Sequence, residues 1–362
     1  MGFGKLFPAL TLTCVSALAV AEAPVLHLYN WSDYFAPETI EEFEKKTGIK
    51  VQYDTYDSNE VLETKLLTGN SGYDLVFPAA SNAVREFQAG ALSAVEHTRL
   101  QNRGNLEAVA VQQLSQYEGG DRFGVPYTWG TTGVAYNVEK IEARMPDAPV
   151  NSLDILFKPE LVSRFADCGV ALLDSPLEVT SIALNYLGFD PYSNKREEID
   201  QAAELIRKVR PHIRYFGTQQ MIQDLAAGDI CLAMVYSGDA GLAQIYADEA
   251  ENGVQVGYAI PVEGTGVWYD VMAIPADAPN PDLAYAFIDY VLQPEVIAGI
   301  TNYTWFANPN REALALVDEE IRTDPNVYPS EEVRSKLFVD LPLEAKNNRY
   351  RNRQWTAMKS GQ

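Results

Sequence analysis

An excess of acidic residues dominates this 362-residue chain, which contains 50 Asp and Glu against 28 Lys and Arg and carries a net charge of −22 at pH 7. This balance argues against nucleic-acid binding, because basic patches supply most of the affinity for a phosphate backbone. It favours the approach of cationic ligands by long-range steering, although acidity can also serve solubility alone.

Residues 1–21 are predicted to be a secretory signal peptide. Lys5 gives a positive start, Leu6–Val20 an apolar stretch, and Ala19-Val20-Ala21 a small-x-small cleavage site. No later segment has the long uncharged apolar run of a membrane helix. The mature chain is therefore expected to be exported and soluble, with no membrane insertion.

The first part of the mature chain alternates strands with helices. We predict strands over Val25–Tyr29, Ile49–Tyr53 and Tyr73–Phe77, with one helix beginning at Pro37 and a second capped by Asn59. A βαβαβ unit forms a parallel sheet, and its ligand crevice lies at the carboxyl ends of the strands. The loop after the first strand is thus a candidate binding segment.

A second alternating region follows, and extended segments are predicted to connect it to the first. Gly133–Asn137 is a predicted strand crossing into it, and Val267–Ile274 is predicted to cross back. The other predicted elements are helices at Glu178–Leu187, Glu197–Val209, Met221–Ala227, Ala240–Ala250 and Leu283–Leu292, and strands at Ile213–Phe216, Ile230–Tyr236 and Val254–Ile260.

The fold class is therefore α/β, with two lobes that hinge around a central cleft. We assign residues 22–131 and 270–310 to lobe 1 and residues 132–269 to lobe 2. Residues 311–362 are expected to form C-terminal helices that pack back on the lobes.

Three short segments, far apart in the sequence, each pair an aromatic ring with a carboxylate. They are Trp31 with Asp33, Tyr236 with Asp239, and Trp268 with Asp270. An aromatic face attracts a cation through the ring quadrupole, and a carboxylate attracts it by charge and hydrogen bonding. Together the pairs could form a cage for an organic cation with more than one ammonium. The alternative is that each ring is a core residue and each Asp a turn residue.

The sequence contains few signs of enzymatic chemistry. His27, His97 and His212 share no spacing typical of a metal site, so no metal is expected. No GxSxG elbow or P-loop is present. Carboxylate pairs are plentiful, so a secreted glycosidase is the enzymatic alternative. A receptor for a sugar or a cationic amino acid is the alternative within the binding class.

Two cysteines, Cys168 and Cys231, remain after removal of the signal. In an exported protein such a pair favours a disulfide. The alternative is two buried free thiols, because free cysteine packs well as a small hydrophobe.

Several short motifs spread along the mature chain together carry a family resemblance. They are Tyr29–Tyr34, Asp57–Glu63, Gly130–Gly133, Asn185–Gly188, Gly228–Cys231, Trp268–Asp270, Arg353–Thr356 and Lys359–Gly361. With these motifs the chain closely resembles the periplasmic polyamine-binding proteins, the putrescine and spermidine receptors of bacterial ABC importers. The resemblance implies a type II periplasmic-binding-protein (venus-flytrap) fold. It also implies a monomeric, non-enzymatic receptor without cofactor, which captures a linear polyamine and delivers it to an inner-membrane ABC permease.

The resemblance also implies a set of ligand-binding residues. Trp31, Tyr236 and Trp268 would be aromatic walls; Asp33, Glu178, Asp239 and Asp270 would receive ammonium groups; Ser32 and Tyr34 would add hydrogen bonds; and Phe306 would close one end. Cys168 and Cys231 fall where family members have a disulfide within the second lobe.

Two positions depart from the family pattern. Ala79 stands where a serine often lines the pocket, and Tyr236 stands where some members have Trp. Trp268 is similar to the spermidine-preferring members, whereas putrescine-preferring ones tend to have Phe. The expectation therefore leans to spermidine, and the first two positions leave the preference open.

Overall fold

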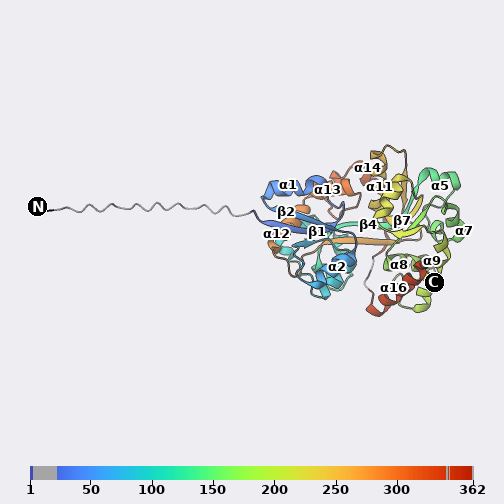
Figure 1. Ribbon diagram of the computed structural model, residues 1–362, viewed down its shortest axis with the longest axis horizontal. Coiled ribbons are helices and arrows are strands. Elements are labelled where there is room, and N and C mark those ends of the chain that lie inside the picture. The colour runs from blue at the N-terminus through green and yellow to red at the C-terminus, as the bar shows by residue number, and fades with distance from the viewer. Residues whose placement is uncertain (3–22, 340, 342, 361–362) are drawn as a thin grey trace.

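The computed structural model describes residues 1–2, 23–339, 341 and 343–360 (Figure 1). Nearly all of the predicted signal peptide, residues 1–21, lies outside these described residues.

A small parallel sheet forms one end of the molecule, where Figure 1 labels β1 and β2. Its strand order is β2-β1-β3, with β1 at Val25–Trp31, β2 at Lys50–Tyr56 and β3 at Leu75–Val76. Strand β1 pairs in parallel with both neighbours, as the βαβαβ prediction requires. The carboxyl end of β1 therefore opens at the middle of this sheet, at Trp31.

The N-cap of the helix after β2 lies one residue before the predicted cap, and the helix itself begins at Asn59. Ser58, not Asn59, caps α2 by accepting a hydrogen bond from the Val61 amide. The Asn59 side chain instead accepts from the Ala79 amide at 3.1 Å, which ties α2 to the next helix. Asn59 was the wrong cap because the backbone turns into the helix at Ser58, whose extended conformation suits the N-cap position.

A larger mixed sheet runs through the rest of the molecule. Its strand order is β10-β9-β4-β7-β5-β6, and β8 also pairs with β4. The strands are β4 Val125–Asn137, β5 Val170–Leu173, β6 Tyr215–Gly217, β7 Leu232–Tyr236, β8 Val256–Ala259, β9 Gly266–Met272 and β10 Phe338–Val339. The predicted strand at 133–137 is the second half of β4, which is much longer than the pattern suggested.

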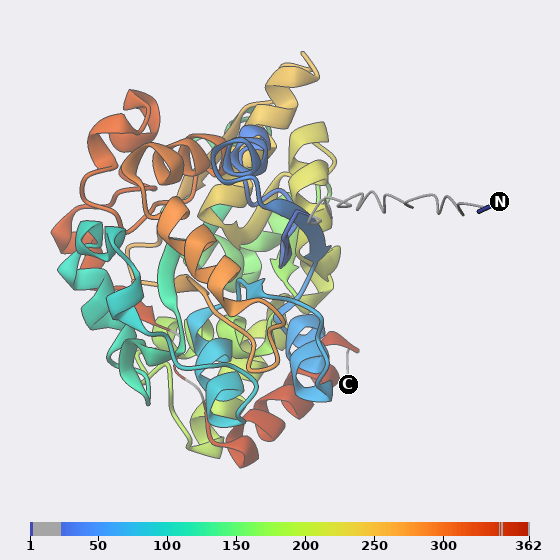
Figure 2. The ribbon, with the colours of Figure 1, turned by 90° about the vertical axis from the view of Figure 1, so that its left-hand side faces the viewer.

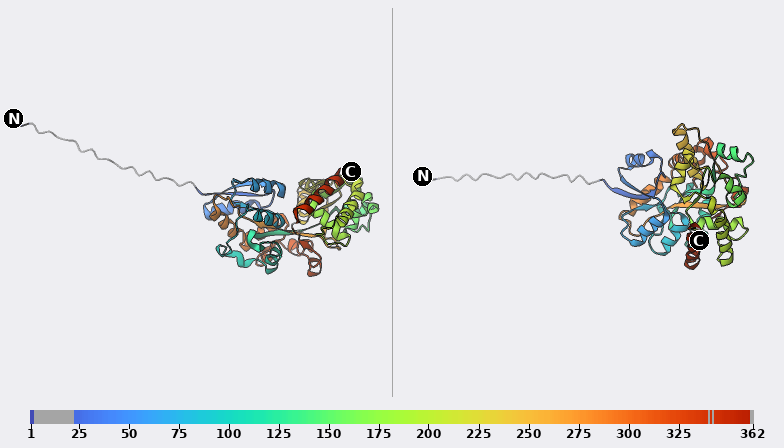
Figure 3. Two further views of the ribbon diagram at one scale, coloured as in Figure 1. Left: turned by 90° about the horizontal axis from the view of Figure 1, so that it is seen from below. Right: turned by 45° about the vertical axis from the view of Figure 1, so that its right-hand side comes forward.

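Two separate hydrophobic cores show why β4 is long. Val125 and Trp129 belong to the first core, whereas Val134 and Ala135 belong to the second. Strand β9 runs antiparallel to β4 at this crossing, with Gly130 opposite Trp268. The two strands therefore connect the two lobes side by side, and the lobes lie at opposite ends of the view from below (Figure 3).

Helices cover both lobes. Those on the first are α1 Pro37–Thr47, α2 Asn59–Thr68, α3 Ala80–Gln88, α4 Ala108–Leu114, α12 Pro281–Val291, α13 Pro294–Thr304, α14 Glu319–Arg322 and α15 Glu331–Arg334. Figure 2 looks onto this lobe. Those on the second are α5 Val138–Arg144, α6 Asp154–Phe157, α7 Pro159–Val162, α8 Pro176–Tyr186, α9 Arg196–Val209, α10 Gln219–Ala227, α11 Ser237–Glu249 and α16 Ala345–Lys359.

The C-terminal segment divides between the lobes. Val317 and Ile321 are buried in the first core, whereas Trp355 and Met358 of α16 are buried in the second. Arg351 is fully buried and donates to Ser181 of α8 and to two backbone carbonyls, which fixes α16 against α8. Figure 3 shows α16, in red, lying with the second lobe.

No single helix in the described ranges is long and apolar enough to cross a membrane. Helices α12 and α13 pass that test only as a pair, and the pair is bent by 77° at its break.

Candidate functional site

A cavity of about 350 Å³ lies between the lobes, and all ten predicted ligand-binding residues line it. Four come from the end of β1 and the loop after it, and the rest come from four other places in the chain. The ten are Trp31, Ser32, Asp33, Tyr34, Glu178, Tyr236, Asp239, Trp268, Asp270 and Phe306. The cavity thus gathers the three aromatic–carboxylate pairs.

Asp270, on β9, is a buried carboxylate that lines the cavity from the first lobe. Its Oδ2 accepts a hydrogen bond of 2.6 Å from the Tyr34 hydroxyl, which also lies 3.0 Å from Thr128 Oγ1. Burial raises the pKa of Asp270 to about 7, and the bond from Tyr34 only partly opposes this shift. Without a cation, this group therefore holds a proton for much of the time near neutral pH.

The second lobe supplies two carboxylates from the first turns of two helices. Glu178 lies in the first turn of α8 and Asp239 in the first turn of α11, where the helix dipole favours negative charge. Glu178 is buried and accepts from the Thr132 hydroxyl and, at 2.9 Å, from the Tyr236 hydroxyl. Burial raises the pKa of Glu178, whereas these hydroxyl donors oppose the shift.

Asp239 keeps some exposure within the cavity, and no other described residue donates a hydrogen bond to its carboxylate. Two effects raise the pKa of Asp239 to about 7: burial is the larger, and the nearby charge of Glu178 is the smaller. The second lobe therefore offers two acids that lack a cationic partner among the described residues.

Aromatic rings meet edge to face around the cavity. The Trp268 ring lies 4.9 Å from Phe306 and 5.7 Å from Tyr236, with interplanar angles of 81° and 78°. Gly130 makes room for the indole, because a Cβ atom there would lie 2.5 Å from Trp268 Cζ2. Gly238 likewise allows the start of α11 to approach Phe306, since a Cβ there would lie 2.2 Å from its ring.

The residues at the end of β1 and in the loop after it differ in exposure. The Trp31 indole donates to the Phe77 carbonyl at 2.9 Å, which fixes the ring at the edge of the sheet. Asp33 is exposed and has a φ of 54°, so it lies in the left-handed region. Asp33 is thus more exposed than Glu178, Asp239 and Asp270, although it lines the same cavity.

Several lining residues were not predicted from the sequence. They are Asp57, Ser58, Asn59, Glu60, Glu63, Ser81, Asn82, Arg85, Asp174, Ser175, Pro176, Leu177, Thr218, Gln219, Ile222, Gly238, Leu242, Thr304, Asn348 and Asn352; Ala79 also lines the cavity. Asp57 and Asp174 each directly follow a parallel strand, β2 and β5, so the strand-end rule could have found them. Asn348 and Asn352 gave no such signal, because they reach the cavity from α16, a helix far from the other lining residues in the sequence.

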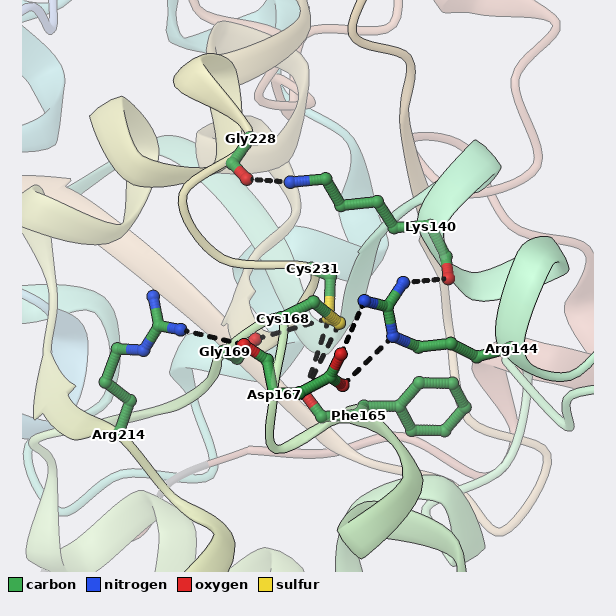
Figure 4. Close-up of polar contacts among 9 residues, drawn as sticks. All are labelled: Lys140, Arg144, Phe165, Asp167, Cys168, Gly169, Arg214, Gly228 and Cys231. Carbon is green, nitrogen blue, oxygen red and sulfur yellow. Dashed lines mark hydrogen bonds and ion pairs between the residues drawn. A yellow bond between two sulfur atoms is a disulfide. The ribbon is translucent and has the colours of Figure 1, made fainter.

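Cys168 and Cys231 are joined by a disulfide, as expected (Figure 4). The two residues lie just before β5 and β7, which pair in parallel with Val170 opposite Leu232. The carboxyl ends of the same strands lead into the cavity. The disulfide therefore fixes the relative position of two strands that carry lining residues. Arg144 and Asp167 form an ion pair of 2.7 Å beside it (Figure 4).

No group of His, Cys, Asp and Glu within the described ranges could hold a metal ion. His27 and His97 instead lie 3.2 and 3.3 Å from Asp74 and Asp121.

Comparisons with known proteins give consistent matches over nearly the whole chain. The family model of the bacterial extracellular solute-binding proteins matches residues 38–329. The chain is 47% identical over 362 residues to a putrescine-binding periplasmic protein of Pseudomonas aeruginosa, with 99% of each chain covered. It is 46% identical over 360 residues to a putrescine-binding periplasmic protein of Escherichia coli, covering 99% of this chain and 97% of that one.

Solved structures give the same picture. A protein described as a spermidine/putrescine ABC transporter from Listeria monocytogenes superposes with a TM-score of 0.82 at 30% identity, covering 94% of this chain and all of that one. The substrate-binding protein of a spermidine/putrescine ABC transporter from Streptococcus pneumoniae superposes with a TM-score of 0.78 at 28% identity, covering 94% and 99%.

Proposed function

Because this chain belongs to the family of bacterial extracellular solute-binding proteins, we propose that it is the periplasmic receptor for a linear polyamine, which it passes to an ABC importer. The relatives named for putrescine and the similar spermidine/putrescine transporter proteins support this function.

The observation that carries the proposal is the charge of the cavity. Glu178, Asp239 and Asp270 lie among aromatic rings. Glu178 and Asp270 accept hydrogen bonds from hydroxyl groups, and Asp239 accepts none from the described residues. An alkyl polyammonium supplies what such a cavity lacks. Its methylenes pack against the rings, and its ammonium groups neutralise buried acids that are otherwise costly to ionise.

We propose that the ten lining residues predicted from the sequence act as follows. Trp31, Tyr236, Trp268 and Phe306 form the walls, Glu178, Asp239 and Asp270 bind ammonium groups, Asp33 attracts the ligand from the cavity rim, and Ser32 and Tyr34 add hydrogen bonds. Tyr34 acts on Asp270 as well, since its hydroxyl already donates to that carboxylate.

Two features bear on which polyamine is preferred. The relatives at 47% and 46% identity are named for putrescine. Trp268 favours the longer spermidine, because the larger ring offers more wall to an extended alkyl chain. We propose that both bind, and direct competition between them decides the order.

We also propose how ligand binding changes the arrangement of the two lobes. The lobes, residues 22–131 with 270–310 and residues 132–269, close about β4 and β9 when a ligand supplies the missing positive charge. The C-terminal segment 311–362 stabilises both lobes. We infer that the receptor acts as a monomer, that it does not turn its ligand over, and that the permease reads the closed surface.

Titration calorimetry tests the function directly. Putrescine, cadaverine, spermidine and spermine should bind with one ligand per chain, and no product should appear on prolonged incubation. Arginine and neutral oligosaccharides serve as the control ligands. Binding of a sugar or arginine without any polyamine binding, or release of reducing sugar from an oligosaccharide, would contradict the proposal.

A further inference from the structure

Thr132 lies where the chain crosses from one lobe to the other. It belongs to β4, three residues after Trp129 of the first core and two before Val134 of the second, and its side chain is fully buried. A polar side chain in such a place needs hydrogen-bond partners. Its partners are therefore informative.

The Thr132 hydroxyl donates to Oε1 of Glu178, the buried acid at the start of α8. The Thr132 carbonyl accepts a bond of 2.6 Å from the hydroxyl of Thr265, which is also fully buried and directly precedes β9. One residue thus joins a cavity carboxylate to both strands that cross between the lobes.

The preceding residue, Thr131, strengthens this connection. Its amide donates to Ser237 Oγ at 3.3 Å, in the first turn of α11. Its hydroxyl lies 2.9 Å from the Tyr258 hydroxyl, which also donates to the Thr131 carbonyl at 2.9 Å. The crossing strand is therefore attached to α8, α11 and β8, the elements around the acids of the second lobe.

We propose that Thr132 is a positioning residue for ligand binding, whose hydroxyl orients the Glu178 carboxylate toward the ligand and connects it to the crossing strands. This inference rests on the proposed polyamine function, because it concerns the acid that would receive an ammonium group.

The physical reason is that Glu178 must be both charged and correctly aimed. The titratable groups that face it are Asp239 on α11, Tyr236 at the end of β7 and Tyr258 on β8, and no described Lys or Arg forms an ion pair with it. Hydroxyl donors favour the ionised form of a carboxylate and lower its pKa. When an ammonium group binds Glu178, a shift of that carboxylate is also transmitted to Thr132, and through Thr132 to the crossing strands β4 and β9.

A double-mutant cycle tests the connection. The variants are Thr132→Val, which removes the hydroxyl but keeps the branched side chain suited to a strand, Glu178→Gln, and the two combined. Thr132→Ser keeps a hydroxyl and should restore most of the affinity. Thr180→Val is the matched control, because it removes a buried hydroxyl of α8 that has no hydrogen bond to Glu178.

We expect Thr132→Val to weaken polyamine binding about tenfold near pH 7, the loss that follows removal of a hydrogen bond to a charged group. The loss should be larger near pH 6 than near pH 9, because Glu178 without this donor is protonated more easily. In the Glu178→Gln background the same change should cost less than about twofold. The ligand-induced decrease in radius of gyration, measured by small-angle scattering at saturation, should also be smaller in Thr132→Val.

Equal, pH-independent losses in both backgrounds would overturn the inference while leaving the proposed function intact. Wild-type chain that binds no polyamine in the same experiment would overturn both. If Thr132→Val does not fold, as judged by its melting curve, Thr132→Ala replaces it. Thr132→Ala removes the same hydroxyl, so the same results are expected and the same results would overturn the inference.

Discussion

Polyamine binding should be coupled to the release of protons. In the absence of ligand, burial raises the pKa of Asp239 and Asp270 to about 7 each. An ammonium group favours the ionised form of a carboxylate, so binding lowers both pKa values and expels the protons. Alkylammonium groups themselves stay charged throughout this range.

The size of the effect follows from the pKa values. Between about pH 8 and pH 6, a carboxyl with a pKa of about 7 changes from about 90% to about 10% ionised, so each group weakens binding about tenfold. Asp239 and Asp270 together should reduce the affinity about 100-fold over these two pH units.

Calorimetry at several pH values, in buffers of different ionisation enthalpy, measures both the affinity and the number of protons released. Asp270→Asn is the control variant, because it removes one titrating group and should roughly halve the logarithmic pH dependence. An affinity that stays constant from about pH 6 to 8, with heats independent of the buffer, would refute the reasoning and show that neither acid is protonated in the empty cavity.

Four further results are expected. Asp239→Asn should cost about 2–5 kcal/mol of binding free energy, because an ammonium group loses its charged partner. Ser32→Ala should cost only about 0.5–1.5 kcal/mol, because it removes one neutral hydrogen bond. Calorimetry that finds the two costs equal would contradict this order. Gly238→Ala should weaken binding about tenfold or more, because its Cβ would lie 2.2 Å from the Phe306 ring in the packed lobes. The melting temperature of the ligand-free protein should change little. Unchanged affinity would argue against this packing in the bound form. Trp268→Phe should weaken spermidine more than putrescine, and an equal loss for both would remove ring size as the cause of preference. Finally, the ligand-free protein should lose stability as pH rises from about 4 to about 7, since carboxyl groups whose folded pKa is raised stabilise the fold only while they stay protonated. Melting curves at several pH values, with and without polyamine, test this. Bound polyamine should remove the loss of stability.

Much of the architecture was predictable because it depends on neighbours in the sequence. The alternation of apolar runs identified the strands of the first sheet, and the aromatic–carboxylate pairs marked the ends of β1 and β7 correctly. Two cysteines in an exported chain were enough to predict the disulfide. These features require only local periodicity, strand-end position or compartment chemistry.

The energetics of the site depended on the packing of distant segments. Asp33 and Asp270 each lie two residues after a tryptophan, yet Asp33 is exposed and Asp270 is buried against Tyr34 with a raised pKa. Thr132 lies in the motif Gly130–Gly133 but was not predicted as a site residue, and its proposed role comes from a hydrogen bond to Glu178, 46 residues away. The sequence by itself determined which side chains could bind a cation. Only the tertiary structure decided which acids lose contact with water and which hydroxyls reach them, because burial and hydrogen bonding arise when both lobes pack around one cavity.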